Sequence, residues 1–468
     1  MRQVPRLIIL LILFVATDFV SAATAFVSYP DDFPSAWTGH KGDTVTFNNL
    51  FYVCEIDPWN DQLTIAYRRL RTPEEYAVGL SEGDSTDYYR IAAQNAADKI
   101  TLHYDVSNSV RLGATIERLR ARIDANQRLT AVESVTFTNN DFPTTRPDLG
   151  DASLVVCGAN IQNYWVTFGK NGAENEEQFQ TQTTKISKAL VHIDADIYAI
   201  CELEEGRKAV STLVNAMNKT KGMDVYAYTE TGFDEYPAMT TNYIYRKDKV
   251  KPYGKMQFPY STTYSAFHYR MMMIGFEQLS TGGKFVLSLN HLLSKVSETT
   301  DDTRLESCRK LITKANSIIK NNTFQDPDIL FLGDYNNYTM EAPNQYLVES
   351  GLVDQLMRLD SAGYSYSYNG EVGYLDRCFS TPSMNDQITA VHPYHLNTDT
   401  YYRYGYKYAD TSMYRYADHD PILVGLRLRI GTDLHEGTVP YSIKKVVQDG
   451  QLLILRDGKL YTIQGFAY

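Results

Sequence analysis

The stretch YRYADHDPILVGL, residues 414–426, places two carboxylates around an imidazole just before an apolar run. Asp418, His419 and Asp420 precede Pro421, and the apolar residues after the proline are typical of a buried strand. A turn that caps the strand would explain these residues without any chemistry. Functional groups, however, often gather in loops at strand ends, where a rigid sheet holds them. The ends of the other buried strands are therefore the places to search for further functional groups.

Several other predicted strands also end in acidic, amide or imidazole side chains. In chain order these are Asn160 and Asn163 after SLVVCGA, Glu202 after DIYAIC, His291 after KFVLSLN, and Asp334 and Asn336 after DILFLG. Carboxylate and amide oxygens suit a hard cation such as Mg²⁺, and two histidines suit acid–base chemistry near neutral pH. Each residue alone also fits a structural role, such as a turn aspartate or a buried histidine.

Apolar runs alternate with segments of helical period between residues 149 and 432, which predicts an α/β sandwich of sheets flanked by helices. Residues 26–148 contain short strand-like runs separated by polar turns, which predicts a small β-rich domain. Within it, residues 110–123 fit either a pair of strands or a helix. Residues 433–468 form a short tail in which LLILRDGKLYTI predicts a β-hairpin.

Residues 1–25 have the pattern of a secretory signal peptide. Arg2 and Arg6 precede an apolar stretch, and small residues end the segment. A membrane anchor is the alternative, but the apolar stretch is short and Asp18 would interrupt it. We therefore expect a mature protein without a membrane span that is secreted, periplasmic or bound to the cell surface.

The composition excludes a strongly basic, DNA-coating protein. The chain has 468 residues and a formal net charge of −11, although a local basic groove is compatible with that total. Its five cysteines show no CxxC pair and no metal-type spacing, so one or two disulfides are conceivable and at least one thiol stays unpaired within the chain.

The ordered set of motifs between Ser153 and Ile430 resembles the endonuclease/exonuclease/phosphatase superfamily, which has the DNase-I-like fold. The motifs are GANIQNYW, YAICELEE, LNHLLSK, FLGDYNNY, YLDRCFS and YADHDP. The resemblance implies metal-dependent hydrolysis of a phosphoester. Mg²⁺ is the implied cofactor, with Mn²⁺ or Ca²⁺ as substitutes.

The resemblance also implies roles for individual residues. The implied metal-site residues are Glu202, Asp418 and Asn160, and the implied catalytic residues are His291, Asp334, Asn336, Asp376 and His419. Asp376 would hold His419 in register, and His291 would contact the scissile phosphate. Under this interpretation the opening stretch supplies one metal-side carboxylate and one acid–base imidazole.

A finer resemblance is to secreted bacterial extracellular nucleases, in which the upstream domain is OB-like. It implies an endonuclease that cleaves DNA or RNA, and no protein partner is inferred. Aromatic and basic residues interleave between residues 401 and 416, so Tyr404 and Arg415, together with Asn163, are candidate substrate contacts. The alternative is that this aromatic stretch packs on the core. Arg377 and Leu293 depart from the branch's usual residues.

Two other functions remain open on the sequence. A small-molecule phosphatase or a sphingomyelinase-like phosphoesterase would have the same fold and a similar set of residues. A catalytically inactive binding protein would not need the full acid–base and metal set. Loss or retention of plasmid nicking in EDTA separates these alternatives.

Overall fold

The computed structural model describes most of the chain between residues 22 and 462. The described residues are 22–24, 40–429 except 49, 58, 78–85, 106–109, 232–237, 261–269, 296–299 and 401–405, and then 444–448, 451–456 and 459–462. Residues 1–21 and 25 of the predicted signal peptide therefore lie outside the described residues. Among those described, no helix combines the length and the apolar character needed to cross a membrane.

The body of the protein is built on two six-stranded sheets. The first has the order β11 (Tyr226–Tyr228), β12 (Met239–Arg246), β10 (Ile197–Glu204), β9 (Leu154–Tyr164), β22 (Ile422–Leu426) and β21 (Ile388–Pro393). The second has the order β13 (Val250–Gln257), β14 (Met271–Gln278), β15 (Lys284–His291), β16 (Ile329–Asp334), β20 (Asp376–Ser380) and β17 (Val353–Asp354). The predicted mixed α/β fold is confirmed.

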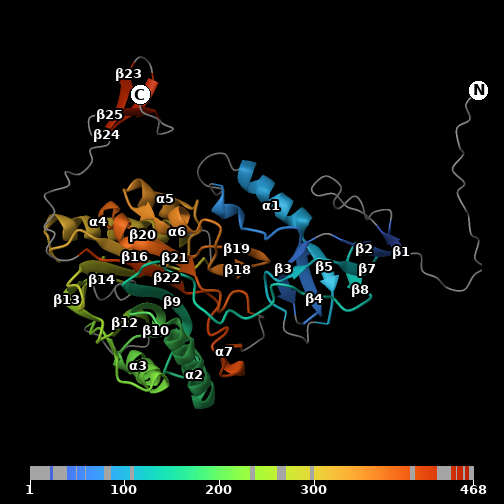
Figure 1. Cartoon of the computed structure of the whole chain (residues 1–468), viewed down its shortest axis with the longest axis horizontal. Coiled ribbons are helices and arrows are strands. Elements are labelled where there is room, and N and C mark those ends of the chain that lie inside the picture. Colours follow the sequence, from blue (N-terminus) through green and yellow to red (C-terminus); the bar gives the residue numbers. More distant parts are fainter. Residues whose placement is uncertain are drawn as a thin grey trace, which may run out of the picture.

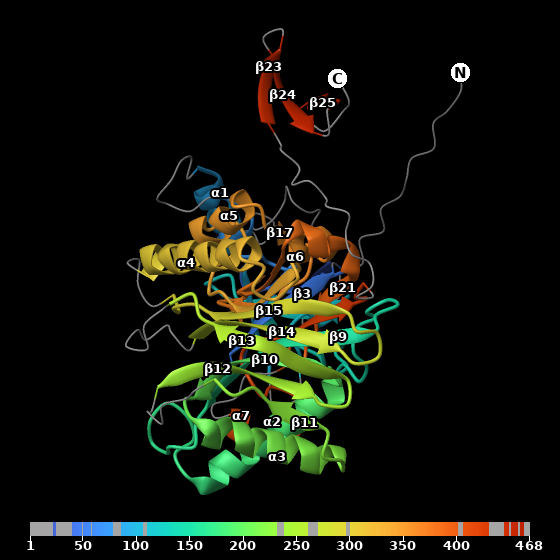
Figure 2. The same ribbon diagram turned by 90° about the vertical axis from the view of Figure 1, so that its left-hand side faces the viewer.

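Helices cover the outer faces of both sheets (Figure 2). The first sheet is covered by α2 (Glu176–Ile193) and α3 (Arg207–Lys221), and the second by α4 (Thr300–Lys320), α5 (Ala342–Glu349) and α6 (Gln355–Leu359). A short helix, α7 (Tyr406–Ala409), lies against α2, and a small hairpin, β18 (Tyr366–Tyr368) with β19 (Glu371–Gly373), precedes β20. The body therefore has four layers, with helices outside and sheets inside.

Strand β10 shows why the central strands read as continuous apolar runs. Ile197, Ala199 and Cys201 pack into the core between the two sheets, whereas Tyr198 and Ile200 pack into the core under α2 and α3. Alternate side chains of a strand point to opposite faces, so a strand covered on both faces needs apolar residues at every position. The charged residues of β10, Glu202 and Glu204, lie at its end.

The N-terminal domain is a separate β-structure with one helix. Its elements are β2 (Thr44–Phe47), β3 (Phe51–Asp57), β4 (Gln62–Ala66), α1 (Thr86–Asp98), β5 (Ile100–His103), β6 (Thr115–Ile116), β7 (Leu119–Ile123) and β8 (Leu129–Ala131). A short strand, β1 (Ala22–Thr24), lies within the predicted signal peptide and pairs in parallel with β2. β3 pairs with β4, β4 with β5, β5 with β8, β8 with β7, and β7 with β2. The pairings form one row of strands from β2 to β3, and the chain connects β2 directly to β3. The strands of this row share one apolar core.

The N-terminal domain lies beside the body (Figure 1), and buried and half-buried polar contacts attach the two parts. Arg69 Nη2 lies 2.9 Å from Asp399 Oδ1, and Lys99 Nζ lies 2.8 Å from Glu371 Oε1. The backbone N–H of Tyr374 donates to the buried Glu75 carboxylate at 3.0 Å. Buried and half-buried ion pairs resist screening by salt. These contacts therefore fix the position of the N-terminal domain on the body.

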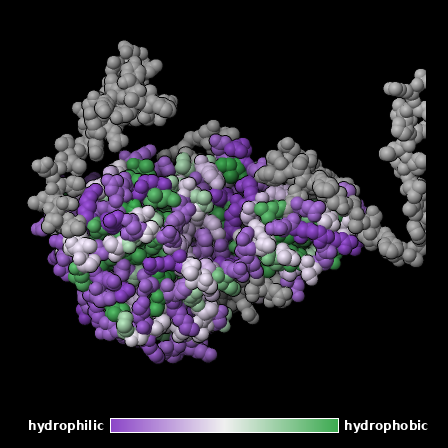
Figure 3. All heavy atoms as spheres, viewed as in Figure 1, coloured by the Kyte–Doolittle hydropathy of each residue, from purple (hydrophilic) through white to green (hydrophobic). Residues whose placement is uncertain are grey.

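The remaining expectations concern the tail and the cysteines. The tail forms a three-stranded sheet of β23 (Lys444–Gln448), β24 (Gln451–Arg456) and β25 (Lys459–Thr462), and the expected hairpin corresponds to β24 and β25. All five cysteines are buried free thiols, so the structure contains no disulfide among them. On the described part of the face in Figure 3, hydrophobic side chains are scattered among hydrophilic ones.

Candidate active site

Three ionisable side chains stand next to one another because of the register of the second sheet. His291 on β15 pairs with Asp334 on β16, and Asp334 pairs in turn with Asp376 on β20. All three are buried. Each is the terminal residue of its strand, so the sheet gathers them at one edge.

Gly333 allows β16 to approach β15 at this edge. Its φ is +137°, and a Cβ placed on it would lie 2.0 Å from the carbonyl oxygen of Asn290. Any side chain would force the two strands apart directly beside His291, and the backbone conformation also favours glycine. The glycine of the GDYN sequence therefore positions its neighbouring aspartate.

The first sheet contributes Asn160 and Glu202 from its parallel strands β9 and β10. Asn160 Nδ2 donates to Glu202 Oε1 at 2.8 Å and to Asp334 Oδ2 at 3.1 Å, which links the two sheets. Glu202 lies at a break in strand register and has a φ of +68°. Such β-bulges redirect a side chain, and here the bulge accompanies the turn of Glu202 towards the facing sheet.

His419 and Asp376 form a buried hydrogen-bonded pair. His419 Nδ1 lies 2.8 Å from Asp376 Oδ2, and His419 Nε2 lies 3.9 Å from Asp334 Oδ2. Because Asp376 occupies Nδ1, Nε2 is the nitrogen that faces the rest of the site. Asp376 is itself held by its backbone N–H, which donates to Ser365 Oγ at 3.1 Å.

The carboxylates around His419 determine its charge. Burial alone would lower the pKa of His419, but the charges of Asp376 and Asp334, the hydrogen bond to Asp376, and the charge of Asp418 together raise this pKa well above its usual value. Burial raises the pKa of Asp334 to about 7; His419 opposes the rise, and Asp376 and Glu202 add to it. The site thus pairs a cationic imidazole with a carboxyl group whose pKa is near neutrality.

His291 has a different environment at the same edge. Its Nε2 lies 3.8 Å from Asp334 Oδ2 and 3.9 Å from Glu202 Oε1, and no described residue hydrogen-bonds to its buried Nδ1. Burial, then the positive charges of Arg270 and His419, lower the pKa of His291 to about 3. Its imidazole is therefore neutral at physiological pH and can donate only one hydrogen bond.

The residues fit a divalent cation. Glu202, His291 and Asp334 bring three ligand atoms within 4.8 Å of one another. Burial, and next the charge of Asp418, raise the pKa of Glu202, and no described residue hydrogen-bonds to the buried Oδ1 of Asp418. A cation between Glu202 and Asp418 would offset their repulsion and give that oxygen a partner.

The other predicted metal residue, Asn160, is close to this group. Its Oδ1 accepts the backbone N–H of Gln162 at 2.9 Å, while its nitrogen faces the two carboxylates. In this arrangement Asn160 orients Glu202 and Asp334. Its role as a direct metal ligand stays a prediction.

Asn336 and Asn163 also lie at the site. Asn336 donates its backbone N–H to Asp334 Oδ1 at 2.9 Å and its Nδ2 to the carbonyl of Leu292 at 3.1 Å. The backbone N–H of Asn163 donates to Glu202 Oε2 at 2.8 Å. Both asparagines have positive φ, a conformation that Asn tolerates better than most residues. Each therefore fixes a carboxylate through its backbone.

The aromatic stretch before His419 is largely structural where it is described. Tyr416 is fully buried, and Tyr414 lies 4.4 Å from Phe142 between ring centroids. These two tyrosines pack within the protein, as the alternative interpretation of this stretch expects. Arg415 lines a pocket beside Asp418, whereas Tyr404 lies outside the described residues. Arg377 is fully buried in an ion pair with Asp354, so it acts within the core.

The sequence analysis missed three residues that contact or act on the two histidines. The ring of Tyr366 lies 4.7 Å from that of His419, and Asn397 Nδ2 donates to the backbone carbonyl of His419 at 2.6 Å. The charge of Arg270 acts on His291 and on Glu202. One available signal was a charge, Arg270, placed directly before the apolar strand β14. Tyr366 gave none, because tyrosine is abundant throughout the chain.

Comparisons with solved structures find proteins of the endonuclease/exonuclease/phosphatase family. One such protein from Bacteroides thetaiotaomicron is 16% identical, with a TM-score of 0.43, over 58% of this chain and 94% of its own. A mannosyl-6-phosphatase from the same organism is 16% identical, with a TM-score of 0.43, over 59% of this chain and 100% of its own. The human Nocturnin catalytic domain is 14% identical, with a TM-score of 0.41, over 62% of this chain and 97% of its own. No protein-family model and no curated protein matches the chain.

Proposed function

We propose that the protein is a metal-dependent phosphodiester hydrolase, and that its substrate is DNA or RNA cleaved internally. The observation that carries the proposal is the convergence of two imidazoles, one cationic and one neutral, on Asp334, beside the Glu202 and Asp418 carboxylates. This set contains a proton donor, a proton acceptor, a neutral hydrogen-bond donor and cation ligands. Hydrolysis of a phosphodiester uses all four.

The two histidines and Asp334 divide the proton transfers. As a water oxygen attacks phosphorus, its proton passes to Asp334, whose pKa of about 7 suits a general base. The bond from phosphorus to the leaving oxygen breaks, and His419 gives its Nε2 proton to that oxygen. His291 donates a hydrogen bond to a phosphoryl oxygen, where negative charge grows in the transition state.

Glu202 and Asp418 would hold Mg²⁺, with Mn²⁺ or Ca²⁺ as substitutes. When bound, the cation acts as a Lewis acid towards the phosphoryl oxygens. Asn160 keeps the Glu202 and Asp334 carboxylates in place through two hydrogen bonds from one amide nitrogen. Asn336 fixes the other oxygen of Asp334.

We further propose a division of the chain into an export signal (1–25), an OB-like domain (26–148), a catalytic domain (149–432) and a short tail (433–468). The order of the strands around one apolar core, with its parallel β5–β8 step, supports an OB-like barrel. All of the proposed catalytic groups come after residue 151. On this proposal the protein works outside the cytoplasm, as a relative of the secreted extracellular nucleases.

The test is cleavage of supercoiled plasmid by purified full-length protein in Mg²⁺ and in excess EDTA. Relaxed and linear products should form with Mg²⁺, disappear with EDTA and return when Mg²⁺ or Mn²⁺ is restored. His419→Ala should abolish the products. His392→Ala is the matched control, since His392 Nδ1 also lies 2.8 Å from an aspartate oxygen, that of Asp360, but outside the site.

Assays of the same purified protein on other phosphoesters distinguish the rival functions. Metal-dependent release of phosphate from sugar phosphates or inositol phosphates, with intact plasmid, would replace the nuclease by a small-molecule phosphatase. Cleavage of sphingomyelin would replace the nuclease by the sphingomyelinase-like phosphoesterase. Full plasmid cleavage in EDTA would contradict the metal role of Glu202 and Asp418.

A further inference from the structure

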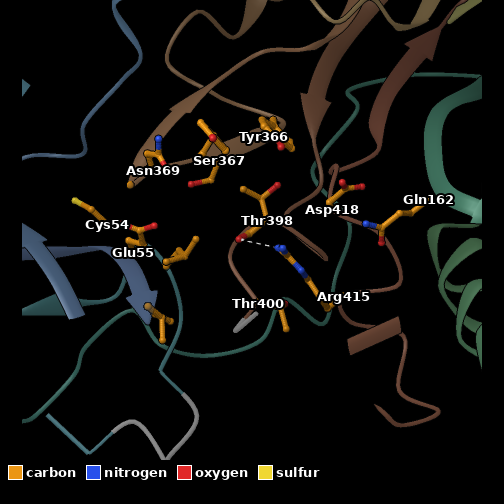
Figure 4. A pocket seen from close by; sticks show the side chains of 14 residues that line it. Cys54, Glu55, Gln162, Tyr366, Ser367, Asn369, Thr398, Thr400, Arg415 and Asp418 are labelled. Atoms are coloured by element: carbon orange, nitrogen blue, oxygen red, sulfur yellow. Dashed lines mark hydrogen bonds between the residues drawn. The ribbon is translucent and has the colours of Figure 1, made fainter. Parts of the chain in front are cut away.

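A pocket of about 460 Å³ lies between the N-terminal domain and the catalytic body (Figure 4). One wall comes from β3 of the N-terminal domain, and the opposite walls come from the β18–β19 hairpin and from residues 398–400. Gln162 and Asp418 line its inner end. The proposed hydrolysis needs none of the β3 side chains, so this space calls for a separate explanation.

A β-bulge in β3 lies beside this pocket and places Glu55 in its wall. The register with β4 shifts between Val53 and Glu55. Val53 and Ile56 both pack in the core of the N-terminal domain. Cys54 is buried against Ala66 and Leu70, and Glu55 lines the pocket. Bulges commonly redirect side chains next to functional sites.

The opposite wall lies directly against the bulge. A Cβ on Gly370, at the tip of the β18–β19 hairpin, would lie 3.5 Å from the Cβ of Glu55, which is ordinary van der Waals contact. The ion pair between Lys99 and Glu371 holds the same hairpin from the other side. The wall carried by the N-terminal domain is thus fixed relative to the body.

The inner end of the pocket adjoins the acid–base centre. Tyr366 lines the pocket, and its ring also lies 4.7 Å from the ring of His419. Asp418 lines the pocket and precedes His419 in the chain. A substrate whose scissile phosphate lies at His419 can therefore extend into this space.

The lining suits an uncharged group that is rich in hydrogen-bond donors. Its carboxylate and cationic side chains are two carboxylates, Glu55 and Asp418, and one guanidinium, that of Arg415. Arg415 donates to the carbonyl oxygens of Asn397 and Thr398 at 2.7 and 3.4 Å. Hydroxyl and amide side chains make up most of the remainder. Asp418 would face the proposed cation, which leaves the Glu55 carboxylate opposite the Arg415 guanidinium, so this wall offers a second phosphate no excess of positive charge. Sugar hydroxyls and base N–H groups would find acceptors here.

Resting on the phosphodiester hydrolysis proposed above, we infer that this pocket binds the sugar–base unit of the nucleotide next to the scissile phosphate. Glu55 of the N-terminal domain accepts hydrogen bonds from that unit. The volume lies in the range of small-molecule sites. The N-terminal domain is then a specificity-determining part of the site, in addition to any contact with the rest of a polymer.

The test compares two substrates that release the same product. The first is thymidine 5′-(p-nitrophenyl phosphate), with its 3′ isomer as an alternative, and the second is methyl p-nitrophenyl phosphate, which lacks a nucleoside. The measured quantity is the ratio of kcat/KM for the better thymidine ester to kcat/KM for the methyl ester. Full-length wild-type, Glu55→Gln and Ser367→Tyr proteins are compared, since Ser367→Tyr reduces the volume from the opposite wall.

We expect this ratio to fall about tenfold in Glu55→Gln, the usual effect of weakening a hydrogen bond to a charged acceptor, and at least as much in Ser367→Tyr. Glu117→Gln, on the exposed surface of the same domain, should keep the wild-type ratio. An unchanged ratio in both pocket variants would overturn the inference alone. A higher ratio in Glu55→Gln would also overturn it, because a phosphate would then occupy this wall. Wild-type protein that cleaves plasmid with Mg²⁺ but hydrolyses neither ester would overturn the inference alone. Wild-type protein that hydrolyses neither ester and also leaves plasmid intact would overturn the proposed function as well.

Discussion

The His419 and His291 regions of the site each contain a buried histidine, but the first imidazole is cationic and the second is neutral. His419 has a carboxylate on Nδ1, and further carboxylates raise its pKa. His291 has no described partner on Nδ1 and lies near the charge of Arg270, so its pKa falls to about 3. Burial lowers the pKa in both regions, and the neighbouring charges decide the result.

This difference assigns the roles of the two residues. An imidazole that is charged at neutral pH can donate a proton, as His419 is proposed to do. A neutral imidazole can only offer a hydrogen bond, which suits His291 as a contact to the phosphoryl group. Substitutions at each histidine test whether this difference exists and how much each region contributes.

The largest effect is expected for His419→Ala. Loss of a general acid should lower the rate of phosphodiester cleavage by about 10²–10⁴-fold. His419→Gln should be no better, because an amide cannot transfer a proton. Cleavage rates at saturating Mg²⁺ measure the effect, and a glutamine variant close to wild type would show that His419 does not transfer a proton.

His291 should be more tolerant of substitution. His291→Ala should lower the rate by about 10²–10³-fold, the range for losing one donor to a transition-state oxygen. His291→Gln should recover part of that rate, since its amide can donate a hydrogen bond. The same assay applies, and equal rates for the alanine and glutamine variants would contradict the role of neutral donor.

The two histidines should affect stability against pH in opposite directions. The pKa of His291 is lower in the folded state than in the unfolded chain, so its contribution to stability is lost as the pH falls below about 6.5. That loss is about 2 kcal/mol at pH 5. The pKa of His419 is raised by folding, so its contribution is present at low pH and is lost as the pH rises through the folded-state pKa.

Thermal unfolding of EDTA-treated protein between pH 5 and pH 7 measures these contributions. His291→Gln should lose less stability than wild type on acidification, and His419→Gln should lose more. His392→Gln is the control for replacing a histidine outside the site. If acidification changes the stability of both site variants in the same direction relative to wild type, the two histidines do not have pKa values shifted in opposite directions.

The smallest effect is expected at Tyr366. Its ring packs on His419, and such aromatic pairs contribute about 0.5–1.5 kcal/mol. Tyr366→Leu should therefore slow cleavage of methyl p-nitrophenyl phosphate about 2–12-fold. Tyr76→Leu, an exposed tyrosine of the N-terminal domain, is the control. A loss as large as that of His419→Ala would mean that Tyr366 takes part directly in the chemistry.

Sequence patterns predicted the body well because its strands are buried on both faces. The apolar run of β10 ends at Glu202, and the helical period of α2 and α3 matches their buried faces. Residues 110–123 were ambiguous, because Leu119, Ala121 and Ile123 alternate over only five residues. The structure resolves them as the strands β6 and β7, whose inward side chains fill the N-terminal core.

Site residues that end a strand could be predicted from the sequence. Site residues placed by contacts between distant loops or between domains could not. His291, Asp334 and Asp376 result directly from strand register. The contact of Asn397 with His419 joins two loops, and no local pattern encodes it. The pocket wall at Glu55 depends on a bulge and on domain packing, and a sequence pattern displays neither.

The central claim, that His419 works as one unit with Asp376, is tested most directly by cleavage rates of four proteins. These are wild type, His419→Ala, Asp376→Asn and the double variant, each measured with Mg²⁺ on plasmid and checked by thermal unfolding. Each single variant should lose about 10²–10⁴-fold. The double variant should lose little more than the worse single variant, because groups that act together are strongly non-additive. Losses that multiply in the double variant, or lower melting temperatures with near-normal rates, would contradict the claim.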